Sequence, residues 1–390
     1  MKQALVIMFL VIGIWPSASL SATTAELEAR LQSLEDEIKL IHEKDNEIHN
    51  DFNQAMSVAG YTDAAYIMDS RDAIRPSFHL HHLSLFFKQH LNENWRFFSE
   101  IEFEDAPKFS AGEPMTILNC GADNICGGVN AADDTSTSIN TLNDTEGKIF
   151  TEAFNIDFTW RSYANLRFGR FFTPAGIWSI DHYPPFVATQ ERPLHIRKIF
   201  PQTTDGVMIY GITSKANNFI AYDAYISNGE NNTSHNDGNT HKAVGLRLNI
   251  DLPYLDRTNI GTTIYHDVSN NNVDKLATGL HTIIRQRNYE LQAEYANALL
   301  KPQGGNNYHS RGYYLQGSYH INHWSLGLRY DFYNSDTRLS TDETNHTLFT
   351  NYHISANLNL KLEHHIFNFK DPAASDYNKT IISISANLGN

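Results

Sequence analysis

The sequence of 390 residues lacks any run of about 18 consecutive apolar residues, the length that crosses a bilayer as a helix. Its mean hydropathy is −0.42. These two features exclude a protein that spans a membrane through α-helices. They do not exclude a membrane β-barrel, because its strands alternate apolar and polar residues and the average hydropathy stays low.

Basic residues are also scarce. The chain carries 30 Lys and Arg against 44 Asp and Glu, which gives a formal net charge of −14. Nucleic-acid binding depends on clustered positive charge that neutralises phosphates. We therefore expect no nucleic acid among the partners of this protein.

There are only two cysteines, Cys120 and Cys126, and they lie in a stretch rich in Gly and Asn. In an oxidising compartment this spacing favours a local disulfide that staples a loop. A metal site would need more ligands than this stretch offers.

Signals of catalysis are missing as well. No Gly-x-Ser-x-Gly nucleophile elbow occurs, and no segment resembles a barrel phospholipase motif. The 19 histidines include the groups His79, His81 and His82, and His364 with His365. Strand alternation sends neighbouring histidines to opposite faces, so three or four ligands would not converge on a metal ion. We expect histidines at the rim and surface, no metal site, no cofactor and no enzymatic activity.

Residues 1–22 have the pattern of a secretory signal. Lys2 supplies a positive charge, Ala4 to Trp15 form an apolar run, and Pro16 to Ala22 are small or polar. The apolar run is too short to span a bilayer. The mature protein is expected to be exported.

Residues 23–55 repeat apolar side chains at steps of four and three. The seam consists of Leu27, Leu31, Leu34, Ile38, Ile41, Ile48 and Phe52, with Asp45 as its one polar member. Such a heptad pattern favours a parallel coiled coil between copies of the chain, and hence an oligomer. The alternative is a single amphipathic helix packed on the rest of the protein.

From residue 56 to residue 390 the hydrophobic period becomes two. Segments such as 154–160 and 324–332 alternate aromatic or aliphatic residues with polar ones. About sixteen such strands are separated alternately by tight turns and by longer connections rich in Asn, Gly and Asp. This pattern predicts a 16-stranded antiparallel outer-membrane β-barrel, in which the apolar face meets lipid and the polar face lines the interior.

The connection at residues 174–202 is unusually long, aromatic and apolar. Long connections in compact folds are usually functional or disordered, and this one is too apolar for a disordered linker. We expect it to fold inward and to determine what passes through the barrel.

This inward loop contains the densest basic group of the sequence: Arg192, His195, Arg197 and Lys198. Positive charge focused in a narrow pore raises the local concentration of anions. The alternative is that these groups pair with Glu191, Asp181 and wall carboxylates, and so hold the loop in place. Both roles can hold together.

The motif Leu166-x-Phe168-Gly169-Arg170-Phe171-x-x-Pro174-x-Gly176, followed by a long loop and then Asp205-Gly206-Val207-x-Ile209-x-Gly211, resembles the phosphate-selective porin O and P family. The resemblance implies a trimeric, water-filled channel in the outer membrane of a Gram-negative cell. It also implies that the loops narrow the channel and that the N-terminal segment lies in the periplasm.

The sequence departs from that family at the lumen wall, where phosphate selectivity is associated with a ladder of basic residues. By alternation the inward basic residues are Arg167, Arg247, Arg329, Arg285, Lys88 and Lys361. The inward acidic residues are Glu100, Glu102, Asp157, Glu104, Asp223, Glu290, Glu294, Asp331 and Glu363. Basic residues are outnumbered, so an anion preference would have to come from the inward loop.

The expected function is passive diffusion of small polar or anionic solutes, including phosphate, through a homotrimer in outer-membrane lipid. One alternative is a TonB-independent uptake receptor for a chelated metal or another bulky solute, which the loop aromatics Trp178, Tyr183, Phe186 and Phe200 would stack on. Another is a structural role, in which the coiled coil tethers the barrel to the cell wall or a periplasmic partner.

Overall fold

The computed structural model describes residues 56–71, 74–105, 147–215, 218–230, 237, 239–253, 257–339 and 341–389. Three expectations lie outside the described residues: the signal segment 1–22, the coiled coil of residues 23–55 with its seam, and the disulfide between Cys120 and Cys126. They remain predictions.

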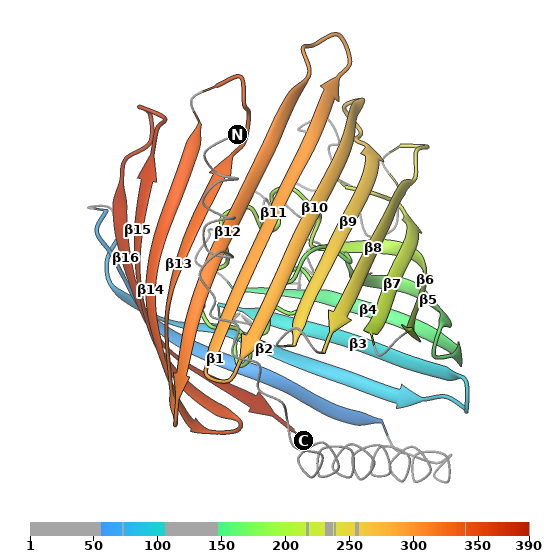
Figure 1. Cartoon of the computed structure of the whole chain (residues 1–390), viewed down its shortest axis with the longest axis horizontal. Coiled ribbons are helices and arrows are strands. Elements are labelled where there is room, and N and C mark those ends of the chain that lie inside the picture. The colour runs from blue at the N-terminus through green and yellow to red at the C-terminus, as the bar shows by residue number, and fades with distance from the viewer. Residues whose placement is uncertain are drawn as a thin grey trace, which may run out of the picture. The chain divides into compact units, whose positions relative to one another are not determined.

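The described residues form a closed antiparallel β-barrel (Figure 1). Its sixteen strands are β1 (Ser57–Asp69), β2 (Ser77–His90), β3 (Trp95–Glu104), β4 (Lys148–Arg161), β5 (Ala164–Phe172), β6 (Thr203–Lys215), β7 (Asn218–Ser227), β8 (Ala243–Leu252), β9 (Thr258–Val268), β10 (Val273–Gln286), β11 (Tyr289–Pro302), β12 (Tyr308–Ile321), β13 (Trp324–Asn334), β14 (Asp342–Ser355), β15 (Leu358–Phe369) and β16 (Tyr377–Leu388). Each strand pairs with the next in sequence, and β1 pairs with β16 to close the ring. The predicted strand number and antiparallel order are confirmed.

The barrel is apolar outside and polar inside. On β13, Leu326 and Leu328 are 47% and 64% exposed on the outer face, whereas Ser325, Arg329 and Asp331 are buried on the inner face. This arrangement reverses that of a soluble β-sandwich and suits a barrel surrounded by lipid. Among the described residues, no helix is long and apolar enough to cross a bilayer.

Long and short connections alternate around the barrel. Short turns such as 162–163, 287–288 and 322–323 join the strands at one end, and the connections at the other end include the 30 residues between β5 and β6. The two ends of the barrel therefore differ, as the sequence predicted.

Among the strands that the structure describes, the register shifts at four places, and two of these β-bulges bear on the charged inner face. Between β1 and β2, Asp63 pairs with His82 but Ala64 pairs with Leu80, so His81 is the additional residue. Between β3 and β4, Glu100 pairs with Ala153 but Ile101 pairs with Thr151, so Glu152 is the additional residue. Beyond a bulge, the set of side chains that points to the barrel interior is displaced by one residue along the strand. His81 and His82 consequently both reach into the interior, and the expectation that neighbouring histidines take opposite faces is wrong at this pair.

Gly169 on β5 occupies a backbone conformation that an L-residue rarely adopts. Its φ is +120°, and a Cβ there would lie 2.2 Å from the Phe154 carbonyl oxygen of β4. Gly304 has a φ of +76°, but a Cβ there would meet no atom within 4 Å. We expect Gly169→Ala to lower the free energy of unfolding by about 2–4 kcal/mol and Gly304→Ala by only about 1 kcal/mol. Urea unfolding in detergent micelles, followed by tryptophan fluorescence, measures both. Equal losses would contradict the backbone clash at Gly169.

Candidate functional site

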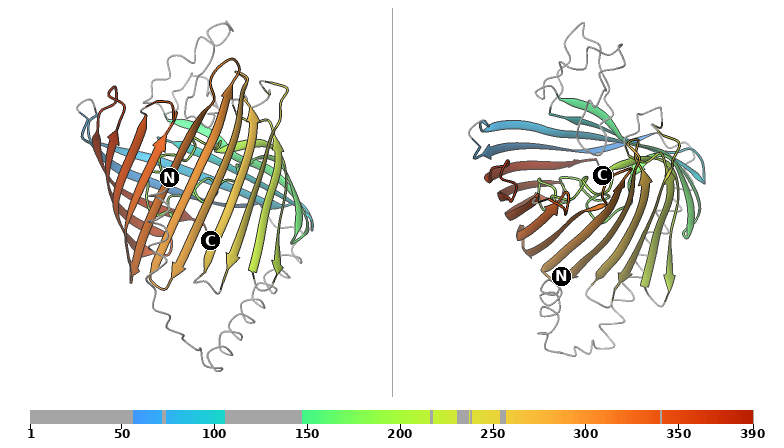
Figure 2. Two further views of the ribbon diagram at one scale, coloured as in Figure 1. Left: turned by 45° about the horizontal axis from the view of Figure 1, so that its top comes forward. Right: turned by 90° about the horizontal axis from the view of Figure 1, so that it is seen from above.

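The connection between β5 and β6 lies inside the barrel (Figure 2, right, green). Its two ends are held together at the wall by the Thr173 N–H, which donates to the Gln202 carbonyl at 2.9 Å. Phe171, Ala175, Ile199 and Phe200 pack in one apolar cluster with residues of the wall. Trp178 packs in a second cluster with Tyr314 of β12. The prediction that residues 174–202 fold inward agrees with this arrangement.

Basic side chains of the wall bind the carbonyl groups of this loop. Lys361 Nζ on β15 donates to the carbonyls of Pro184 and Val187, the latter at 2.6 Å. Arg247 Nη2 on β8 donates to the Gly176 carbonyl at 3.1 Å. An irregular segment in a barrel interior must satisfy its backbone polar groups there, and these two cations do so.

Arg329 on β13 makes the most extensive of these contacts. Its Nη2 donates to the Glu191 carbonyl at 3.0 Å, and its Nη1 donates to the Thr189 hydroxyl. Its Nε pairs with Asp331 at 2.9 Å, and neither of the two side chains has any exposed surface. Arg329 therefore connects the loop to a buried carboxylate of its own strand.

Acidic side chains complete the attachment. Glu294 on β11 accepts the Trp178 N–H at 3.1 Å, and Glu363 on β15 accepts the N–H groups of Gln190 and Glu191. On the loop itself, Glu191 pairs with Lys379 of β16 at 2.7 Å. Charged groups therefore hold the loop, but the wall supplies most of them; of the predicted basic group on the loop, Lys198 pairs with a wall carboxylate, Glu343.

The loop lies between two cavities of the interior. The long-loop cavity, of about 870 Å³, is lined by strand ends next to the long connections, including Ile67, Phe369 and Tyr377. The short-turn cavity, of about 360 Å³, is lined by residues at the opposite end, including Leu252 and Arg285. Residues of the loop line both cavities, so the loop occupies the barrel interior between them.

Arg192 and Arg197 face the long-loop cavity. Arg192 acts on Glu152 electrostatically but forms no ion pair with the described residues, and the Nε and Nη2 atoms of Arg197 are buried without a partner among them. Burial, and then Arg192, lower the pKa of Arg197 to about 10, while Glu152, Glu102 and Glu104 oppose this effect. The guanidinium therefore stays charged at neutral pH. Arg197 also has a φ of +65°, a strained conformation of the kind found at functional sites.

The other predicted loop residues occupy different places. Lys198 lines the long-loop cavity, where it pairs with Glu343 at 3.1 Å. His195 is buried and its ring stacks on Tyr314, and burial lowers its pKa to about 3, so it adds no charge. Asp181 lines the short-turn cavity instead. Only Arg192, Arg197 and Lys198 of the predicted basic group come together.

The predicted wall residues all face the interior, and most are paired. Arg167 donates to both oxygens of Asp157 at 2.7 Å, and Arg285 pairs with Glu290 at 2.6 Å. Glu100 and Glu102 are buried at the inner face of β3.

Alternation did not identify several charged residues of the wall, and three of them are close to other charged groups. These three are Asp63, Glu152 and Asp205; the first two lie at the bulges, and Asp205 holds Arg170 at 2.7 Å.

The predicted positions of the histidines and aromatic residues need correction. His82, His281 and His365 are buried in the interior, so the expectation of rim and surface histidines is wrong for them. Trp178 and Phe200 are buried in packing contacts, and Phe200 presents only 8% of its surface at the lining of the long-loop cavity, whereas Phe186 is exposed. The stacking surface expected for a bulky ligand is therefore not formed by Trp178 and Phe200.

Comparison with solved structures shows the same fold. The anion-selective porin from Comamonas acidovorans is 12% identical, with 85% of this chain and 99% of that chain covered and a TM-score of 0.58. The outer membrane channel DcaP of Acinetobacter baumannii is 10% identical, with coverages of 85% and 96% and a TM-score of 0.55. OmpT of Vibrio cholerae, in its trimer form, is 11% identical, with coverages of 86% and 100% and a TM-score of 0.53.

Comparison with known sequences identifies the family. An uncharacterised protein of Aquifex aeolicus (strain VF5) is 29% identical over 178 residues, which is 45% of this chain but only 33% of that protein. The sequence profile of the Gram-negative porins matches residues 88–372, from β2 to the connection after β15. The chain therefore belongs to the Gram-negative porin family, and its barrel is an outer-membrane channel for the passive diffusion of solutes.

Proposed function

We propose that this porin favours small anions, including phosphate, over cations of the same size. The observation that carries the proposal is the charge of the long-loop cavity. Its lining contains the five basic residues Arg192, Arg197, Lys198, Lys275 and Lys379 and the four glutamates Glu104, Glu191, Glu230 and Glu343. The lining is thus net basic by one charge, although the wall as a whole is rich in carboxylates.

The pairing of these charges strengthens the argument. Lys198, Lys275 and Lys379 each pair with one of the glutamates, Glu343, Glu230 and Glu191 respectively. Among the lining glutamates, Glu104 then remains for Arg192 and Arg197, and the buried Glu102 and Glu152 also act on Arg197 electrostatically. A site bounded by protein of low dielectric constant focuses their field, and this raises the local concentration of anions.

The likeness to the phosphate-selective porin O and P family supports the same preference, and so does the name of the Comamonas acidovorans porin. We further propose that the protein is a homotrimer whose N-terminal heptad segment, residues 23–55, lies in the periplasm. The heptad seam and the trimer form of Vibrio cholerae OmpT support this assembly.

Recording from a planar bilayer tests the proposal. The purified protein is expected to insert as conducting units that close in three equal steps. The reversal potential in a potassium chloride gradient should have the sign that indicates a preference for chloride over potassium. Phosphate added to one side should shift the reversal potential with the sign expected for phosphate passing through the channel. A non-conducting barrel, or a reversal potential of the sign for potassium preference, would refute the anion channel. Single-step closure would refute the trimer alone.

A further inference from the structure

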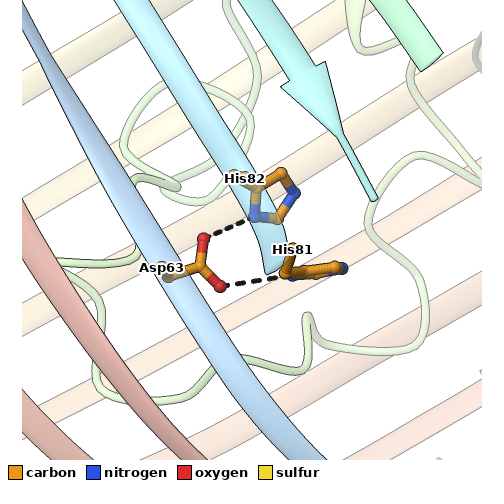
Figure 3. A group of neighbouring side chains, drawn as sticks. All are labelled: Asp63, His81 and His82. Atoms are coloured by element: carbon orange, nitrogen blue, oxygen red, sulfur yellow. Dashed lines mark hydrogen bonds and ion pairs between the residues drawn. The ribbon is translucent and has the colours of Figure 1, made fainter. Parts of the chain in front are cut away.

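Five titratable side chains gather on the inner faces of β1, β2 and β3, at the edge of the long-loop cavity. They are Asp63, His81, His82, Glu102 and Glu104. Strand register accounts for the cluster, because His82 pairs with Asp63 on one side and with Glu104 on the other. The bulge at His81 turns both histidines inward (Figure 3).

His82 is oriented by a carboxylate. Its Nδ1 lies 2.7 Å from Asp63 Oδ1, so Nδ1 carries the proton and donates it to Asp63 (Figure 3). The other ring nitrogen, Nε2, lies 3.6 Å from Glu104 Oε1. Two ligands of one tetrahedral zinc ion lie about 3.4 Å apart, so this separation leaves room for a shared metal. A histidine that donates its second nitrogen to a carboxylate is the usual arrangement of a metal-binding histidine.

Glu102 provides an independent observation. Its side chain is 1% exposed, and its Oε1 is buried without a hydrogen-bond partner in the described part of the chain. Its Oε2 accepts the Tyr61 hydroxyl. A buried carboxylate oxygen without a donor or a cation is energetically costly, so this position requires a positive partner. Ligand atoms of His82, Glu102 and Glu104 lie within 4.8 Å of one another.

We propose that His82 Nε2, Glu102 and Glu104 bind a divalent transition-metal ion such as zinc, and that Asp63 positions the His82 ring. Three protein ligands leave the fourth position to water. His82 and Glu104 line the long-loop cavity, which gives the ion an entry route. One nitrogen and two oxygen ligands suit zinc or cobalt, whereas calcium and magnesium take ligand sets of oxygen alone.

Other groups near the cluster do not replace the metal. A doubly protonated His82 would bridge Asp63 and Glu104 and would act on Glu102 electrostatically, but Glu102 Oε1 would still have no hydrogen-bond donor in the described part of the chain. Arg197 acts on Glu102 and Glu104 electrostatically, yet its Nε and Nη2 donate to neither of them. Asp63 is less suited as a ligand, because its Oδ2 already accepts the Gln190 side-chain amide at 2.6 Å.

Titration of the full-length protein in detergent, after treatment with a chelator, tests this site. Cobalt should give the visible absorption of a tetrahedral complex at about one equivalent per chain, and zinc should displace it. His82→Gln and Glu102→Gln should each weaken binding by at least about tenfold, and Asp63→Asn by about 10–100-fold. His281→Gln is the matched control, because His281 is also a buried interior histidine but lies on β10. It should leave the affinity for cobalt unchanged.

The absorbance of the cobalt complex does not depend on ion selectivity, so this test is independent of the anion proposal. Absence of the cobalt spectrum in the wild-type protein would overturn the site. So would a wild-type affinity in both His82→Gln and Glu102→Gln. Bilayer conductance of each variant shows whether its barrel has folded. The site is tested with two different substitutions, so the result stands even if one of the two variants does not fold.

Discussion

Replacing Arg329 by methionine is expected to lower the free energy of unfolding by about 3–5 kcal/mol, the usual cost of leaving one partner of a buried ion pair uncompensated. Arg329 and Asp331 have no exposed side-chain surface, so no water can replace the lost guanidinium. The substitution also removes the donors to Thr189 and to the Glu191 carbonyl of the inward loop. Urea unfolding in micelles measures the loss.

A second variant separates the two consequences. In Arg329→Met combined with Asp331→Asn, the buried negative charge is gone, and most of the stability should return because an ion pair contributes little more than an apolar substitute. The loop attachment stays broken in the double variant. Both variants should therefore show increased current noise, whereas only the single variant should be strongly destabilised. Equal instability of the two would show that the loop contacts, and not the buried charge, carry the energy.

Removing Arg192 and Arg197 together is expected to lower the ratio of anion to cation permeability by about fivefold. Two unit charges close to a permeating ion contribute roughly 0.5–1 kcal/mol between them at an effective dielectric constant near that of water. In Arg192→Ala combined with Arg197→Ala, the long-loop cavity keeps only basic residues that are paired with glutamates. The reversal potential in a salt gradient measures the change, which should be toward cations.

The matched control also removes two positive charges, but from exposed connections between strands. Arg338 pairs with Asp336 and Lys370 with Asp342, and their side chains are 42% and 70% exposed. Because both side chains are exposed and each is paired with a carboxylate, water and salt screen their charges, so Arg338→Ala combined with Lys370→Ala should change the reversal potential much less. A similar shift in both double variants would mean that total charge, and not the position of Arg192 and Arg197, determines selectivity.

Much of the barrel was predictable from the residues alone. The alternation in segments such as 324–332 identified strand, inner face and outer face at once, because a period of two is a local property of the chain. The number of strands, the two kinds of connection and the inward position of Arg167, Glu102 and Asp331 were correctly predicted in this way.

The long connection between β5 and β6 was predicted to fold inward from its apolar composition, but its attachments were not. Lys361 was assigned to the pore wall, whereas it binds the carbonyls of Pro184 and Val187. Alternation identifies the face that a side chain occupies, but it does not show which distant segment that side chain meets.

Alternation along the chain was sufficient to predict the barrel, its polarity and the residues that can face a solute. The tertiary structure decided which of their charges remain unpaired. Lys198 and Lys379 are paired with glutamates, whereas Arg192 and Arg197 form no ion pair within the described residues. It also decided the His82 cluster, since the register of β2 with its two neighbours places His82 beside Asp63 and Glu104. The physical reason is that periodicity is local, whereas pairing and bulges depend on the register between segments far apart in the chain.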